Sequence, residues 1–175
     1  MSFSLALVLA QAVVRVSPPE PELPPSDPAA AFALFKTVCF DPYPDTRGFV
    51  AAMAGLPQFV RWQPTTDVER LIPGQTWHSP TARVQYWERP GILPPPQCQV
   101  FTTAPAGTEP EQLFPRLAAS LGLGRGRISG NKRNRTAMWD LDQPEGARWR
   151  VIFGTRQQDG QIQLRLSILN LGDEN

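Results

Sequence analysis

The sequence predicts an α+β domain: a mostly antiparallel sheet of five or six strands, with two N-terminal helices and one inserted helix packed on one face. The first observation is a strict alternation of large apolar and polar residues between Arg148 and Leu169, as in strands with one buried face. The second is helical spacing of apolar residues after Pro28 and again after Pro110. The third is a set of short extended runs between these helical segments.

Composition narrows the class of protein. A chain of 175 residues is long enough for one domain with a hydrophobic core. A net charge of +1 does not favour a nucleic-acid binder with a wholly basic surface. No residue pattern indicates a cofactor. The 20 prolines cluster in linkers and loops, so they do not indicate a disordered chain.

Residues 1–14 are predicted to be an export signal, which places the protein in a bacterial periplasm or outside the cell. The apolar run Leu5–Val14 is too short to span a bilayer, which takes about 20 residues. Ala10-Gln11-Ala12 matches the small-x-small pattern of a cleavage site. The first four residues lack the Lys or Arg of a usual signal, so either the signal is atypical or its start lies upstream of Met1. The alternative to export is a buried strand or helix at the N-terminus. No transmembrane span is expected.

A Pro-rich linker at residues 15–28 precedes a single domain at 29–171. Ser26 or Asp27 is expected to cap the first helix, and Pro28 suits its first turn. Apolar side chains at three- and four-residue spacing place Phe32, Phe35 and Cys39 on one face.

A second helix is predicted from Asp45, through Phe49, Val50 and Met53, to Gly55-Leu56, with Asp45 as its cap. Phe59, Val60 and Trp62 extend its apolar stripe. Three strands follow, at Gln75–His78, Ala82–Trp87 and Gln97–Thr102.

The inserted helix is predicted to start at a capping box, Thr108 to Glu111, and to end at Gly122, with Pro115 causing a kink or a late start. A loop should follow from Gly124 to Thr136. A strand should then carry Ala137, Trp139 and Leu141.

The last two strands form a hairpin. Large apolar residues occupy every second position in both strands, with Gln157–Gly160 between them. Asp159-Gly160 supplies the positive φ angles of a tight turn. The apolar positions are Trp149, Val151, Phe153, Ile162, Leu164, Leu166 and Ile168.

The two cysteines are predicted to form a disulfide. Cys39 lies on the apolar face of the first helix, and Cys98 lies on the apolar face of its strand. If the helix covers the sheet, the two sulfurs face each other, and an oxidising compartment would join them. The alternative is a pair of reduced core cysteines in a cytosolic protein.

Few residues suggest catalysis. His78 is the only histidine, and it could pair with Ser79 or Cys39 as nucleophile, but no third group orients it. Asp140 and Asp142 share one side of a strand end, near Glu145, and could hold a cation or act as an acid/base pair. The plainer interpretations are a surface histidine and ordinary turn acids, with no metal site.

The strongest binding candidate is a basic segment with several glycines, which suits an anionic envelope component or an acidic protein surface. A solvated loop without a partner is the alternative. The cations are Arg125, Arg127, Lys132, Arg133 and Arg135.

The polar sheet face is a second candidate surface. Trp87 and Phe101 fall on it, and they could form a binding surface with nearby arginines or stack on those arginines within the domain. The arginines are Arg83, Arg148, Arg150 and Arg165. The leading hypothesis is therefore a non-catalytic exported binding module. The alternatives are a small hydrolase or transferase that uses His78 or the Asp140/Asp142 pair, and a structural piece of a larger envelope assembly.

Overall fold

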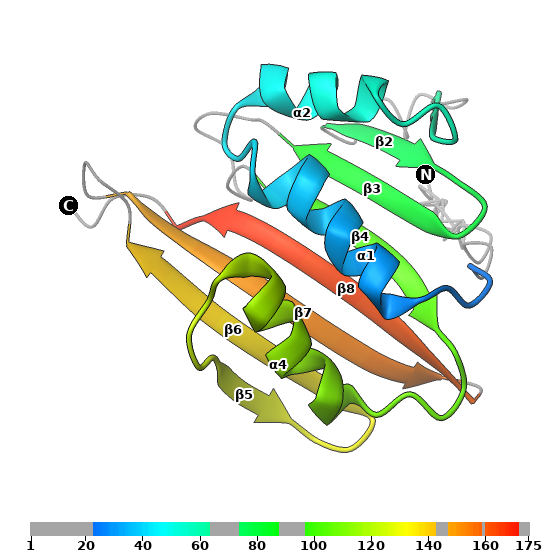
Figure 1. Cartoon of the computed structure of the whole chain (residues 1–175), viewed down its shortest axis with the longest axis vertical. Coiled ribbons are helices and arrows are strands. Elements are labelled where there is room, and N and C mark those ends of the chain that lie inside the picture. Colours follow the sequence, from blue (N-terminus) through cyan, green and yellow to red (C-terminus); the bar gives the residue numbers. More distant parts are fainter. Residues whose placement is uncertain (1–22, 64–73, 88–96, 143–146, 159, 172–175) are drawn as a thin grey trace, which may run out of the picture.

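The computed structural model describes residues 23–63, 74–87, 97–142, 147–158 and 160–171. The predicted export signal, Asp159 and Glu145 lie outside these residues. The described chain is α+β, with one antiparallel sheet of eight strands and three α-helices that lie on one face of it (Figure 1). No helix in this part of the chain has the length and apolar character needed to cross a membrane.

The helices are α1 (Pro28–Phe35), which continues into a π-helical turn η1 (Lys36–Phe40), α2 (Thr46–Ala54) and α4 (Pro110–Leu121). The strands are β1 (Val60–Arg61), β2 (Gln75–His78), β3 (Ala82–Trp87), β4 (Gln97–Ala104), β5 (Arg127–Gly130), β6 (Asn134–Asp142), β7 (Arg148–Gln158) and β8 (Gln161–Asn170).

The predicted count of five or six strands was too low, and the two strands not predicted are the two edges, β1 and β5. The strand order is β1-β2-β3-β4-β8-β7-β6-β5. β1 has only two residues, and all four residues of β5 are exposed. A strand without a buried face has no apolar alternation, so neither edge left a pattern in the sequence.

The sheet consists of two four-strand meanders, β1–β4 and β5–β8, which meet where β4 pairs with β8. Helix α4 connects the centre of the sheet to its far edge at β5 (Figure 1). The C-terminal hairpin has the predicted tight turn, because Gln158 pairs with Gln161 and Gly160 has a φ of 79°.

The core lies between the helices and the predicted apolar face of the sheet. Leu164 and Leu166 are buried, as are Val151 and Phe153 in the neighbouring strand. Phe153 makes T-shaped contacts with Phe32 of α1 and Phe114 of α4, with ring centroids 5.5 and 5.4 Å away. Phe49 of α2 stacks on Tyr86 at 4.5 Å. All three helices therefore contribute aromatic rings to one core.

The predicted disulfide is present. Cys39 lies in η1 and Cys98 in β4, with a Cα–Cα distance of 5.4 Å, and both residues are buried. The bond ties the end of the first helix to a central strand.

Two of the three predicted helix caps are confirmed. The Asp27 carboxylate accepts from the Ala29 N–H, and Asp45 accepts from the N–H groups of Arg47 and Gly48. The capping box at Thr108 is wrong. The N-cap is Glu109, without a side-chain cap bond, while the Thr108 hydroxyl donates to the Pro105 carbonyl at 2.7 Å.

The apolar stripe predicted after α2 is also wrong in part. Val60 is 70 % exposed on the edge strand β1, because the chain has left the helix and entered the sheet there. At the other end of α1, Pro25 bridges to Thr103, and the Ser26 N–H donates to the Thr103 carbonyl at 2.8 Å. The last residues of the Pro-rich segment thus contact β4.

Candidate binding site

The basic segment is a β-hairpin, so the prediction of a loop from Gly124 to Thr136 was wrong. β5 pairs with β6 from Arg127↔Met138 to Gly130↔Arg135. The turn is closed by the Asn131 N–H, which donates to the Asn134 carbonyl at 2.9 Å. Gly130 has a φ of 99°, a conformation that glycine adopts readily. We call residues 125–135 the basic hairpin.

Two cations of the basic hairpin are paired with carboxylates of the same domain. Arg127 contacts Asp140 at 2.6 Å, and Arg135 contacts Glu111 of α4 at 2.7 Å. Among the described residues, no ion pair involves the other three, and all three are exposed: Arg125, Lys132 and Arg133. The basic hairpin is therefore held in place by two ion pairs and carries three further positive charges at the surface.

Asp140 pairs with two arginines, Arg127 and Arg150. Its carboxylate accepts from Arg150 Nε at 2.5 Å. This bond to Arg150, together with the charges of Arg150, Arg127 and Arg148, lowers the pKa of Asp140. A carboxylate held ionised by arginines is a poor proton donor. Asp142 lies two residues further along β6, paired in register with Arg148, and the described residues contain no cluster of three or more metal-ligand side chains.

The groups that could make His78 catalytic are occupied by other contacts. His78 ends β2 in register with Val60 and Arg83, and burial lowers its pKa. The Ser79 hydroxyl closes the β2–β3 turn, where it accepts from the Ala82 N–H at 3.0 Å and donates to the Ala82 carbonyl at 3.2 Å. Cys39 is in the disulfide. The structure does not bring His78 together with either predicted nucleophile.

An apolar groove lies between α4 and the basic hairpin, with a volume of about 400 Å³. The Trp139 indole lines it and is oriented by a 2.9 Å hydrogen bond from Nε1 to the Gly124 carbonyl. Ile128 lies in its wall and is 55 % exposed. Arg125 and Glu111 also line the groove, together with its apolar residues Phe114, Pro115, Ala118, Ala119 and Leu123.

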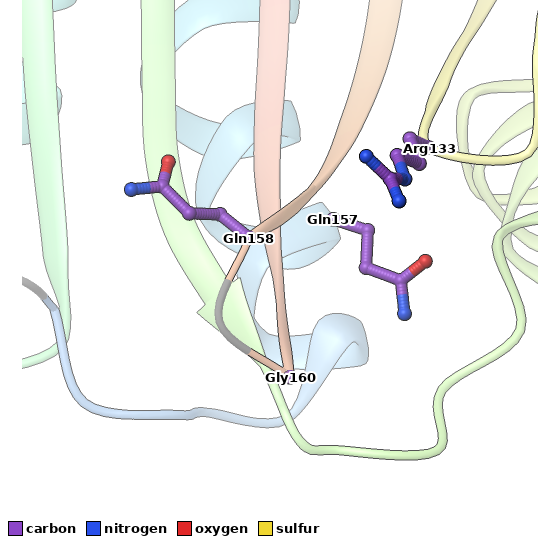
Figure 2. Close-up of a pocket in the computed structure, with 4 residues that line it drawn as sticks. All are labelled: Arg133, Gln157, Gln158 and Gly160. Carbon is purple, nitrogen blue, oxygen red and sulfur yellow. The ribbon is translucent and has the colours of Figure 1, made fainter.

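A second, polar hollow of about 480 Å³ lies where the turn of the basic hairpin meets the β7–β8 turn, and it is lined by Arg133, Gln157, Gln158 and Gly160. Figure 2 shows Arg133 and Gln157 on one side of the β7–β8 turn and the Gln158 side chain on the other. The Gln157 N–H donates to the Arg133 carbonyl at 2.7 Å, which ties the two turns together. A guanidinium beside an amide offers donors to an anionic oxygen.

The aromatic residue at the centre of the polar sheet face stacks within the domain. The Arg83 guanidinium lies 4.3 Å from the Phe101 ring centroid, and that of Arg165 lies 5.9 Å away. Burial lowers the pKa of Arg83. The intramolecular cation–π interpretation of Phe101 is thus confirmed, and this face is a weaker binding candidate than the basic hairpin.

The groove is the part of the site that the sequence analysis missed. Its signals were weak but present: Ile128 is a lone large apolar residue between cations, and Phe114 and Ala118 widen the apolar stripe of α4 beyond Leu113 and Leu117. Only the packing of α4 beside β5 brings them together.

In comparisons with known proteins, no family model matches this sequence, and no curated protein or solved structure matches it significantly.

Proposed function

We propose that this chain is an exported, disulfide-stabilised binding module that recognises an acidic partner through the basic hairpin. The observation that carries the proposal is the set of three exposed cations, Arg125, Lys132 and Arg133, on a hairpin that two ion pairs already hold in place. The buried Cys39–Cys98 bond supports export, because disulfides persist in oxidising compartments.

A preformed basic surface attracts an anionic partner efficiently. Clustered like charges raise the local concentration of an oppositely charged partner and speed its association. Glu111 neutralises Arg135, whereas Asp140 divides its single charge between Arg127 and Arg150. The net positive potential therefore comes mainly from the other three cations. The polar hollow beside Arg133 adds donors for an anionic group.

The hydrolase or transferase alternative has less support. Ser79 is engaged in a turn, Cys39 is oxidised, and Asp140 is held between Arg127 and Arg150. A general base must lie within hydrogen-bond reach of the proton that it abstracts. Ser79, Cys39 and Asp140 are each held by different contacts and do not form one site.

A titration with hexaglutamate at low salt tests the proposal. In ¹H–¹⁵N spectra, the shifted amides are expected to cluster at residues 125–135, and added salt should weaken binding by screening. Arg125→Glu and Arg133→Glu are each expected to weaken binding by about threefold or more. Arg47→Glu is the matched control, since it makes the same charge change at an exposed position of α2. This helix lies over the opposite half of the sheet (Figure 1).

Three outcomes contradict the proposal: no binding of hexaglutamate, shifts centred away from the basic hairpin, or an equal loss in the Arg47→Glu control.

A further inference from the structure

We propose that the partner binds as an extended acidic segment that adds a strand to β5 and places an apolar side chain in the groove beside α4. This inference rests on the proposed function and specifies the chemistry of the partner.

The first step of the argument is the free edge of β5. β5 is the last strand in the sheet order, and all four of its residues are exposed. An edge strand presents a row of backbone N–H and C=O groups that another chain can pair with. The opposite edge, β1, has two residues and offers a shorter template.

The second step is the face to which an added strand would direct its side chains. Ile128 pairs with Ala137, which is fully buried in the core, so Ile128 lies on the helix-bearing face. A residue of an added strand opposite Ile128 would point to the same face. That face is where the groove lies, and the residue would cover the exposed side of Ile128.

The third step is the fit of the groove to such an anchor. Its volume of about 400 Å³ falls within the usual range of ligand pockets, about 300–1,000 Å³. Its lining residues Phe114, Ala118 and Trp139 are apolar, which suits an aliphatic or aromatic side chain.

The fourth step is charge. Arg125 lines the groove, while Glu111, which also lines it, is paired with Arg135 at 2.7 Å. The neighbours of the anchor on an added strand would point to the opposite face, where Arg127 and Arg150 share the single negative charge of Asp140 and leave a net positive charge. Carboxylates next to the anchor are therefore favoured, and basic neighbours would be repelled.

A free amphiphile with an anionic head group is the competing ligand, because it would meet the same groove and Arg125. It would make no use of the backbone of β5. The exposed edge beside the groove favours the extended polypeptide, and the experiment separates the two.

The probe is a labelled seven-residue peptide in which four glutamates alternate with valine, leucine and valine, so that the central leucine lies between two glutamates. Binding is measured by fluorescence anisotropy. A peptide with serine in place of leucine is expected to bind about tenfold more weakly, the equivalent of losing one buried leucine. Methylation of alternate backbone nitrogens of the leucine peptide should also remove its advantage over the serine peptide. It eliminates the N–H donors for strand pairing and keeps every side chain.

Variants of α4 test the location. Ala119→Phe fills the groove and should reduce binding of the leucine peptide to the level of the serine peptide. Ser120→Phe is the matched control, because it makes the same bulky addition at the next exposed position, outside the groove, and should leave binding unchanged.

The outcomes distinguish the two proposals. If leucine, serine and N-methylated peptides bind equally, strand addition is wrong and the acidic-partner function stands. If dodecanoate competes with the leucine peptide and binds more tightly, the groove is a lipid site and strand addition is again wrong. If no acidic peptide binds, both proposals fail.

Discussion

Cys39 and Cys98 are bonded to each other at the centre of the fold, where Cys98 of β4 lies opposite Ile168 of β8. β4 and β8 are the strands that join the two meanders, so the bond connects the first helical segment to the seam of the whole sheet.

Removing this bond is expected to be costly. The cysteines are 59 residues apart, and closing a loop of that size stabilises a domain by about 4 kcal/mol in the chain-entropy model. In urea denaturation, the free energy of unfolding of the Cys39→Ala/Cys98→Ala variant should be lower than that of wild type by that amount. Wild-type protein in reductant is the control and should show a comparable loss. An unfolding midpoint that does not respond to reductant would contradict the prediction.

The two faces of β8 should respond differently to truncation. Leu166 is fully buried, so Leu166→Ala should lower the free energy of unfolding by about 2–5 kcal/mol. Arg165 is the neighbouring position on the other face, and its guanidinium lies 5.9 Å from the Phe101 ring centroid. Arg165→Ala should lower the free energy of unfolding by less than about 1 kcal/mol. Equal losses in chemical denaturation would mean that the sheet faces are assigned wrongly.

Gly126 is expected to be intolerant of a side chain. A Cβ atom there would lie 2.6 Å from Trp139 Cε2, so the buried indole would have to move. Gly126→Ala should destabilise the domain by about 1–3 kcal/mol, as overpacking does, and change the tryptophan fluorescence. Gly124→Ala is the matched control, because nothing lies within 4 Å of a Cβ at that position. If Gly126→Ala changed neither the stability nor the fluorescence, Trp139 would not pack closely against Gly126.

Asp140 should make stability depend on acid pH. Because the arginines lower its pKa below the ordinary 3.8, its stabilisation is complete above that value and is lost as pH falls through the folded-state pKa. With the side chain 39 % exposed, screening limits the pair energy, and Asp140→Asn should cost about 0.5–1 kcal/mol at neutral pH. The variant should lose stability less steeply than wild type in thermal melts below pH 4. If stability depended on pH in the same way in Asp140→Asn and wild type, the ion pairs of Asp140 would contribute nothing to stability.

His78 provides a spectroscopic test, because the chain has one histidine. Burial lowers its pKa, so its ring resonances should titrate with a midpoint below 6.5. Between that midpoint and 6.5 the unfolded chain binds a proton that the folded chain does not, so His78 should reduce stability as pH falls through this range. A midpoint above 6.5 would indicate an acidic partner and would revive the catalytic alternative.

Local patterns in the sequence determined the elements that bury one face. The alternation around Leu164 and Leu166 predicted the C-terminal hairpin, and Asp27 and Asp45 marked two helix starts. The disulfide followed from the same logic, since Cys39 and Cys98 both occupy apolar positions. Burial imposes a period of two or 3.6 residues, which can be read without coordinates.

The edge strands and the groove were decided only by tertiary structure. β5 buries no residue of its own and is a strand because Arg127–Gly130 pairs with β6, a contact that leaves no local pattern. The groove exists because α4 packs beside that edge and brings Phe114 near Ile128 and Trp139. The groove depends on segments that are distant in the sequence, so its energy comes from contacts that no short sequence window contains.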